Sequence, residues 1–242
     1  MITIFIHIPR TAGTTLQAIA REQYEPDEIC RIYGKYIADP HRVLAVVTAD
    51  HEIPTKWVTG HIAYGVHAAL DGDYQYVTFL RDPIERTLSV YHYIRHSPGH
   101  HLHSYAKSMG LAEFMESGVT NELDNGQVRQ IAGTLGELPQ IPLAGIWKEC
   151  QPCRKYELDM ALKHLRDFAV VGITERFQES LLQFRDVLGW DIGDEMLHIN
   201  ALRGRPHAQD VGPDTLAAIK RYNRLDQELY EYGLELFEER GG

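Results

Sequence analysis

The chain has little of what would direct it to several classes of protein. It contains only three cysteines in 242 residues, too few for a disulfide framework. It has no run of 18 apolar residues, so no membrane-spanning helix is predicted. Its first residues read as a core strand and lack the basic flank and cleavage site of a signal peptide. From these absences we expect a reduced, cytoplasmic setting.

Positive charge is also scarce. The chain has 24 Lys and Arg against 34 Asp and Glu, a formal net charge of −10, whereas nucleic acid backbones require clustered cations. Duplex DNA and RNA are therefore excluded as bulk partners, but a local basic pocket can still bind a small anion. The length suits one domain over residues 1–242, with helical insertions.

Strands and helices alternate along the sequence. Apolar strands are predicted at 2–8, 42–48, 57–61, 76–80 and 168–173. Helices are predicted at 14–23, 83–96, 111–117, 125–135, 156–165, 179–188 and 214–239. This order predicts an α/β fold, a P-loop-like doubly wound parallel sheet flanked by helices.

The first strand runs into a turn built for an anion. Residues 9–15 read Pro-Arg-Thr-Ala-Gly-Thr-Thr, and small residues let backbone N–H groups approach a phosphate at the start of a helix. Thr14 and Thr15 add hydroxyl donors, and Arg10 adds a cation able to bind bidentately. A Walker A loop needs a second glycine and a lysine, and both are missing. The alternative is a plain strand–helix turn.

A second anion site is predicted after the strand at 76–80. Arg81 ends that strand, and the helix behind it, opened by Asp82, carries Ser89. Arg81 should lie on the same sheet edge as Arg10, and an arginine with a hydroxyl suits a separate phosphate. The alternative is that Arg81 pairs with Asp82 or Glu85 while Ser89 lies on the helix surface. Two sites on one edge favour a donor with phosphate at both ends over ATP.

These two segments resemble a known family. HIPRTAGTTL and FLRDPIERTLSVYHY are similar to the 5′-phosphosulfate loop and the 3′-phosphate motif of sulfotransferases that use PAPS, 3′-phosphoadenosine 5′-phosphosulfate. Softer similarity at 60–67, 124–133, 171–181 and 199–206 is to the carbohydrate branch that includes heparan sulfate 2-O-sulfotransferase and bacterial relatives. The resemblance implies sulfuryl transfer from PAPS to an acceptor hydroxyl, with PAP as product and no metal. It implies a small-molecule or oligosaccharide acceptor, most plausibly a sugar. The cofactor-binding residues that it implies are Arg10, Thr11, Ala12, Gly13, Thr14, Thr15, Arg81, Ser89, Arg203 and Arg205.

Two catalytic residues are expected. The family usually has lysine where this chain has Arg10, and an arginine stays ionised and cannot donate a proton. Arg10 should therefore stabilise charge on the leaving group. His61 follows a predicted strand and matches the family's catalytic histidine, so it is our candidate for the base that accepts the proton of the acceptor. Glu52, Asp50 and His67 are the competitors.

The remaining candidates each have a structural alternative. Tyr64 and His67 follow His61 and are candidate acceptor contacts. Asn125 and Arg129 lie four residues apart, on one helical face, and either contact the acceptor or cofactor or form a helix-surface hydrogen bond. Arg203 and Arg205 either clamp the 3′-phosphate or adenine or form an exposed basic loop.

The sequence leaves two rival functions open. A P-loop-like kinase or NTPase would use Asp50 for Mg²⁺, against the missing Walker lysine. A degenerate PAP-binding module without turnover is prompted by Arg10. Four histidines between 96 and 103 and the pair Cys150 and Cys153 lack the spacing and partners of a firm metal site. No pattern predicts the identity of the acceptor or an oligomeric state.

Overall fold

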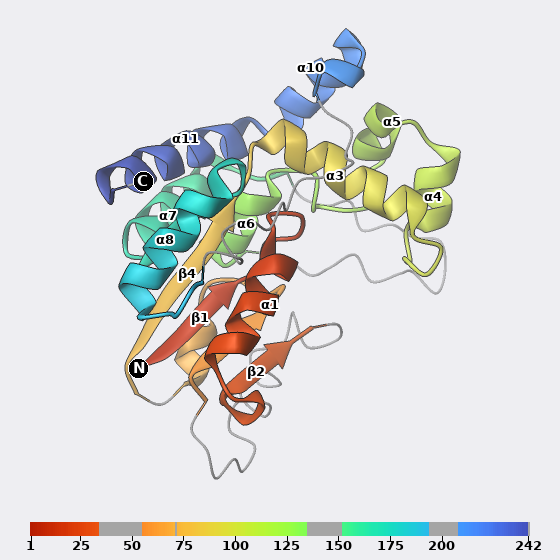
Figure 1. Ribbon diagram of the computed structural model, residues 1–242. Helices are drawn as coiled ribbons and strands as arrows, with labels where there is room; N and C mark the ends of the chain where they lie inside the picture. The colour runs from red at the N-terminus through yellow and green to blue at the C-terminus, as the bar shows by residue number, and fades with distance from the viewer. Residues whose placement is uncertain (34–54, 71, 135–151, 194–207, 242) are drawn as a thin grey trace.

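A computed structural model describes residues 1–33, 55–70, 72–134, 152–193 and 208–241 (Figure 1). Its sheet contains β1 (Ile2–Ile6), β2 (Ile29–Ile32), β3 (Trp57–Gly60), β4 (Tyr74–Leu80) and β5 (Val170–Ile173). The strands are parallel, in the order β2-β3-β1-β4-β5. The predicted α/β class with a parallel sheet is confirmed, and the single domain over 1–242 stays a prediction.

Helices cover both faces of the sheet. The α-helices are α1 (Gly13–Gln23), α3 (Pro83–His96), α4 (His103–Ser108), α5 (Leu111–Glu116), α6 (Gly126–Ala132), α7 (Lys155–Arg166), α8 (Phe177–Leu188), α10 (Pro213–Tyr222) and α11 (Arg224–Glu239). Short 3₁₀ turns are η1 (Pro26–Glu28), η3 (Val66–Ala69), η4 (Thr174–Arg176) and η5 (Ala208–Asp210).

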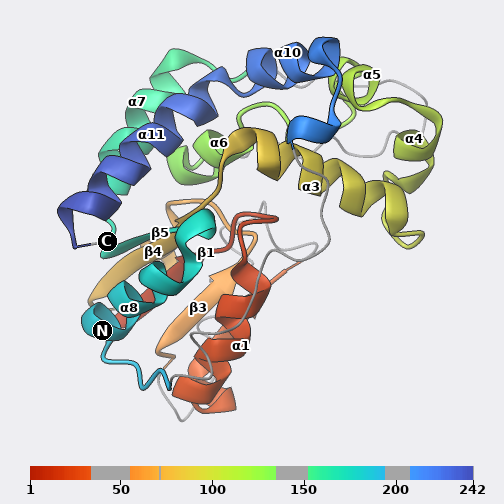
Figure 2. The same cartoon turned by 45° about the horizontal axis from the view of Figure 1, so that its top comes forward.

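Three apolar clusters hold these layers together. On one face, α1 and α8 pack on strand residues such as Phe5 and Phe79, and on the other, α6, α7 and α11 pack on residues such as Ile4 and Val171 (Figure 2). A third cluster joins α3, α4, α5 and α10 beyond the sheet edge. The doubly wound arrangement and the helical insertions follow from this alternation of apolar faces.

The helix α3 begins where the sequence predicted it to begin. Asp82 is its N-cap, and its carboxylate accepts hydrogen bonds from the N–H groups of Ile84 (2.9 Å) and Glu85 (3.0 Å). Pro83 occupies the first helical position, where no N–H is needed. The cap therefore fixes the direction in which α3 leaves the end of β4.

One strand was not predicted, one predicted helix is wrong and one predicted strand falls outside the described residues. The strand β2 was not predicted, because four residues, Ile-Cys-Arg-Ile, give too short a pattern. The long helix predicted at 214–239 is wrong: it is split at Asn223, whose side chain bonds Ile219 O (3.0 Å) and competes with the helical backbone. The strand predicted at 42–48 lies outside the described residues.

The strand order reverses between β1 and β4 at the carboxyl edge of the sheet. After β1 the chain passes to β2 on one side, and after β4 it passes to β5 on the other side. Ligands of open α/β sheets bind outside the carboxyl ends of strands at such a reversal. The carboxyl ends of β1 and β4 therefore mark where the site should lie, beneath α3 (Figure 2). Over the described part of the chain, none of the helices has the length and apolar character that crossing a membrane requires.

Candidate active site

The loop between β1 and α1 has an unusual backbone. Arg10 (φ 69°) and Ala12 (φ 64°) adopt the left-handed conformation that side-chain-bearing residues rarely occupy. Two buried arginines hold the loop in that shape. Arg86 Nε donates to Pro9 O (3.1 Å) and Arg81 Nη1 donates to Arg10 O (3.2 Å). Both carbonyls are thus turned toward the β4–α3 segment.

The opposite side of the loop presents hydrogen-bond donors. Within the described part of the chain, no backbone acceptor bonds the N–H groups of Thr11, Ala12, Gly13 and Thr14. The helical hydrogen bonds of α1 begin after them, where the N–H groups of Thr15 (3.0 Å) and Leu16 (3.2 Å) donate to Ala12 O. These donors stand at the positive end of α1. The Thr14 side chain is exposed and that of Thr15 half-buried. The arrangement suits an anion such as phosphate or phosphosulfate.

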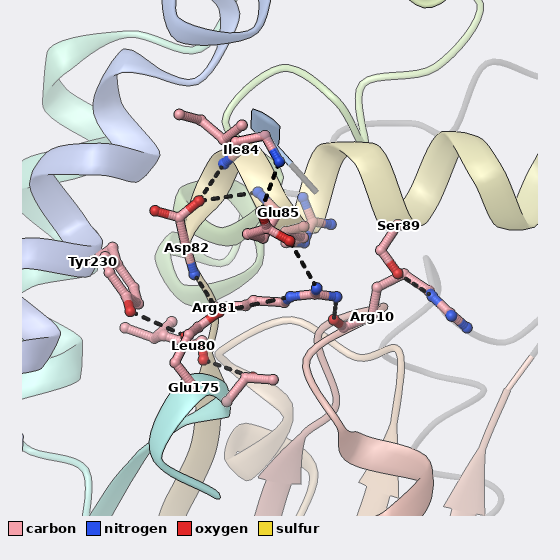
Figure 3. Close-up of polar contacts among 12 residues, drawn as sticks. Arg10, Leu80, Arg81, Asp82, Ile84, Glu85, Ser89, Glu175 and Tyr230 are labelled. Atoms are coloured by element: carbon pink, nitrogen blue, oxygen red, sulfur yellow. Dashed lines mark hydrogen bonds and ion pairs between the residues drawn. The ribbon is translucent and has the colours of Figure 1, made fainter. Parts of the chain in front are cut away.

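The two predicted anion motifs meet in one place. Arg10 Nε donates to Ser89 Oγ (3.0 Å), and the guanidinium lies over the Tyr93 ring, 5.0 Å from its centroid (Figure 3). Ser89 is 2% exposed, so the alternative that it is a helix-surface residue is wrong. A plain strand–helix turn would not need a hydrogen bond from its arginine to a second helix, so this contact argues against that alternative. Ser89 therefore lies on the face that α3 turns toward the loop, and Arg10 reaches this face from the loop.

Arg81 lies underneath this face rather than on it. It is 2% exposed, and its guanidinium lies 3.6 Å from Glu85 and 3.7 Å from Glu175 (Figure 3). Its backbone N–H and C=O both bond the amide of Gln127 (3.0 and 2.9 Å). The alternative that Arg81 pairs with Glu85 thus matches the geometry. The structure shows Arg81 shaping the loop through Arg10 O, and its contact with a phosphate stays a prediction.

His61 follows β3 on the neighbouring strand end. Its ring packs against those of His7 (centroids 4.8 Å apart) and Tyr33 (5.0 Å). Burial lowers the pKa of His61, so the neutral imidazole is the form present near neutral pH. His7 Nδ1 accepts from Gln17 Nε2 (2.7 Å), which leaves the ring proton on Nε2. A Cβ at Gly13 would lie 2.0 Å from the His7 ring, so His7 also explains the glycine of the loop.

Tyr64 and His67 are placed away from this edge. The Tyr64 ring stacks on His164 of α7 at 3.6 Å, and His67 Nδ1 shares a hydrogen bond with Tyr76 OH (2.8 Å) and stacks on Tyr74. Tyr74 and Tyr76 belong to the amino-terminal half of β4, opposite the start of β1. These partners account for the orientation of both rings, and the roles of Tyr64 and His67 at the acceptor, or of His67 as the base, stay predictions.

Asn125 and Arg129 have structural partners. Asn125 Oδ1 accepts from the N–H groups of Leu225 (2.7 Å) and Asp226 (3.0 Å) and so caps α11. Arg129 donates to the backbone and carboxylate of Asp124 at 2.8 and 2.7 Å. The Asp226 carboxylate in turn caps α6, because it accepts from two N–H groups there (3.1 and 2.8 Å). Both residues are 5% exposed, so their hydrogen bonds are buried and not on a helix surface, and their contact with an acceptor or cofactor stays a prediction.

Several candidates lie outside the described residues. They are Arg203 and Arg205, the competitors Asp50 and Glu52, and Cys150. Among the residues that are described, no group of three or more His, Cys, Asp and Glu side chains is arranged to hold a metal ion.

Comparison with known proteins agrees with this geometry. A family model described as galactose-3-O-sulfotransferase matches residues 61–237, most of the chain. The chain belongs to this family. The chain is 25% identical to heparan-sulfate 6-O-sulfotransferase 1-B of Danio rerio over 191 residues, which cover 69% of this chain and 44% of that protein. It is 26% identical to heparan-sulfate 6-O-sulfotransferase 1 of Homo sapiens over an alignment of 278 residues with gaps, which covers 99% of this chain and 66% of that protein.

The solved structure of mouse sulfotransferase SULT7A1 complexed with PAP is also similar, with a TM-score of 0.46 and 14% identity over 80% of this chain and 60% of that one. The resemblance to carbohydrate sulfotransferases is confirmed by the family match and the curated relatives. The predicted cytoplasmic location is contradicted by those relatives, which are named as enzymes of heparan sulfate. Scarce cysteines report on disulfides and cannot by themselves place a protein in a compartment.

Arg86 and His7 were not predicted from the sequence as parts of the site. Arg86 sits inside the FLRDPIERTLSVYHY segment, five residues after Arg81, and that position gives no sign that its side chain reaches back to Pro9. His7 was visible within HIPRTAGTTL, immediately before the loop, and its position at the strand end was the available signal.

Proposed function

We propose that this sulfotransferase moves a sulfuryl group from PAPS to a hydroxyl of a carbohydrate. The observation that carries the proposal is the loop at 10–14, whose N–H donors at the start of α1 meet no backbone acceptor among the described residues, and which is bonded through Arg10 to Ser89 on α3. When bound, PAPS would supply the sulfuryl group. The unpaired donors and the cation of the loop suit such an anion better than they suit a structural turn.

The loop and Arg10 would stabilise charge at the leaving phosphate. Donors that are already oriented need little rearrangement as negative charge develops, and this is the usual source of most electrostatic catalysis. Arg10 would act as a fixed cation, since it cannot release its proton. Ser89 would orient Arg10 and, with Arg81 beneath, provide the hydroxyl and charge for the 3′-phosphate.

His61 would accept the proton of the acceptor hydroxyl. It is neutral near pH 7 because burial lowers its pKa, and only the neutral imidazole can take up a proton. Its ring is held by His7 and Tyr33 at 4.8 and 5.0 Å. An oriented base of this kind contributes about 10²- to 10⁴-fold to turnover.

The donor is tested by a thermal-shift screen of PAP, PAPS, ATP and GTP. PAP at 100 times its Kd should raise stability by about 2.7 kcal/mol, whereas ATP and GTP should have little effect. If ATP with Mg²⁺ stabilised the protein and PAP did not, the result would instead support a kinase or NTPase function. Binding of PAP with no transfer from labelled PAPS to a panel of neutral and acidic oligosaccharides would identify a binding module without turnover.

A further inference from the structure

A stretch of the chain beside the donor loop carries no acidic residue. Residues 86–112, which run from α3 to the start of α5, contain no Asp or Glu, although the chain has 34 of them and a net charge of −10. The same stretch holds five of the 13 histidines, namely His92, His96, His100, His101 and His103. A local gathering of groups that can become positive, in an otherwise acidic protein, indicates a binding surface for anions.

This stretch is continuous with the donor loop. His92 and Tyr93 follow Ser89 by three and four residues, so they lie on the side of α3 that Ser89 turns toward the loop. The Arg10 guanidinium lies 5.0 Å from the centroid of the Tyr93 ring, and the His100 ring meets the same ring edge-on at 5.9 Å. Tyr93 is 46% exposed. An acceptor that approaches Arg10 would therefore lie against this surface, where α3 extends past the sheet edge toward α4 (Figure 2).

Four of the histidines form two stacked pairs, which we call the histidine face: His92 with His96, and His100 with His101. The ring centroids of the first pair lie 4.1 Å apart and those of the second 4.5 Å apart. His92, His96 and His101 are exposed, and His100 is half-buried. Two imidazolium rings at such distances repel each other, so an anion beside a pair favours its protonation.

The hydrogen bonds of two of these rings show how a proton adds a donor. His96 Nδ1 lies 2.8 Å from His92 O, a carbonyl that can only accept, so Nδ1 carries the proton and Nε2 can take up a second one. His100 Nδ1 instead accepts from the N–H of Leu102 (3.2 Å), which leaves the proton of the neutral ring on Nε2. The face therefore offers a donor near neutral pH and gains others as the pH falls below about 6.5.

The groups around the face leave its charge without a neutralising partner. From the donor loop, α3 beyond Ser89 and α4, the charged or titratable groups are Arg10, Tyr91, Tyr93, Arg95, Tyr105 and Lys107. The carboxylates of neighbouring segments are Glu113, Glu116, Glu122, Asp210 and Asp214, and within the described residues none of them bonds a histidine of the face. Burial, His96 and Arg10 lower the pKa of His92, and burial, His101 and His103 lower the pKa of His100. An anion from outside the protein can therefore supply the missing negative charge.

We propose that the histidine face binds an anionic group of the acceptor, a sulfate ester or a carboxylate on a sugar unit away from the reacting hydroxyl, and that acceptor affinity rises as the histidines become protonated. The proposal rests on the proposed function, because Arg10 marks where the reacting hydroxyl approaches. The exposed Tyr93 ring would pack against the sugar between these two points. Acceptor binding is then favoured in a mildly acidic medium, and release is favoured near neutral pH.

The experiment measures binding of a sulfated dextran oligosaccharide by calorimetry at pH 7.5, 6.5 and 5.5, without PAP. Sulfate esters stay ionised over this range, so any change in affinity comes from the protein. The native protein should bind about 10- to 100-fold more tightly at pH 5.5 than at pH 7.5, as one or two charged hydrogen bonds form. Unsulfated dextran of the same length should bind weakly at every pH.

Single substitutions separate the face from the overall charge of the protein. His96→Gln and His101→Gln should each reduce the dependence on pH, and His96→Lys, which stays positive, should bind more tightly than the native protein at pH 7.5. The matched control is His164→Gln, because His164 lies on α7 and stacks on Tyr64. This control should keep the native dependence on pH.

Loss of the pH dependence in the His96 and His101 variants, with its retention in His164→Gln, supports the histidine face. Equal pH dependence in all variants, or equal binding of the two dextrans, overturns it. NMR titration gives an independent check: the pKa of His96 and His101 should rise when sulfated dextran binds, and an unchanged pKa of both contradicts the proposal. A native chain that binds no PAP counts against the proposed function alone, since dextran binding is measured without PAP.

Discussion

Replacing Arg10 with alanine should damage donor binding far more than folding. The substitution removes the cation that lies beside the N–H donors of the loop and bonds Ser89 Oγ at 3.0 Å. A hydrogen bond between a charged donor and a phosphate contributes about 1.5–3 kcal/mol. Since about 1.4 kcal/mol corresponds to a factor of ten, the affinity for PAP should fall about 10- to 150-fold.

The effect of the same change on stability should be small. Arg10 loses one hydrogen bond, to Ser89, and the contact with the half-exposed ring of Tyr93, which together amount to about 1–2 kcal/mol. For a chain of this size that corresponds to a fall in melting temperature of about 2–8 °C. Arg10→Gly should unfold roughly 1–4 °C above Arg10→Ala, because glycine accepts the φ of 69° without the left-handed penalty but loses more backbone entropy.

Isothermal titration calorimetry with PAP and thermal unfolding measure the two effects on the same samples. Arg95→Ala is the control, because it removes one positive charge from the far end of α3. PAP affinity in Arg10→Ala within about threefold of the native value would refute the placement of Arg10 at the donor. An equal loss in Arg95→Ala would show that the effect is one of net charge.

Three further changes test other parts of the site. His61→Ala should lower sulfuryl transfer from labelled PAPS about 10²- to 10⁴-fold while PAP affinity stays nearly constant, and retained turnover would exclude His61 as the base. Gly13→Ala should lower the free energy of unfolding in urea by about 1–3 kcal/mol and weaken PAP binding, because its Cβ would lie 2.0 Å from the His7 ring. Gly110→Ala, whose Cβ meets nothing within 4 Å, is the control. Equal stability of the two variants would contradict the packing of Gly13 against His7. His7→Asn should make stability less dependent on pH on the acid side. The pKa of His7 in the folded protein is about 3 against an ordinary 6.5, so the stability that neutral His7 contributes is complete above pH 6.5 and is lost as the pH falls toward 3. Between pH 7 and 5 the native protein should therefore lose about 2 kcal/mol more of its free energy of unfolding than the variant. Parallel profiles would show that His7 is not buried in the neutral form.

The sheet edge could be predicted from the sequence because its signals are local. Apolar runs mark β1 and β4, and the cap formed by Asp82 with Pro83 marks the start of α3 to the residue. Parallel strands place their carboxyl ends together, so Arg10 and Arg81 were expected on one edge, and Arg81 Nη1 donates to Arg10 O there (3.2 Å). No such local signal marks β2, whose four residues gain their place only by pairing with β3.

The direction of the side chains could not be predicted, because it depends on distant partners. The position of Arg81 at a strand end is local, but its burial is decided by Glu175, 94 positions along the chain, and by the loop carbonyl that it meets. Asn125 likewise looks like a surface residue until α11 supplies two N–H groups to it. Tyr64 follows His61 closely in sequence, yet it turns toward His164 of α7.

The shape of the donor loop is imposed from α3 and not by the loop's own composition. Left-handed backbone at Arg10 and Ala12 costs about 1–2 kcal/mol at each position in residues that carry a Cβ. The hydrogen bonds from Arg86 to Pro9 O and from Arg81 to Arg10 O are made by buried, charged donors, which contribute about 1.5–3 kcal/mol each and offset that cost. A loop with one glycine can therefore hold a conformation that usually needs several. Because the two arginines fix the carbonyls on one side, the N–H donors stay aligned on the other before any anion arrives, and we expect substitutions of Arg86, which bonds Pro9 O, to weaken anion binding.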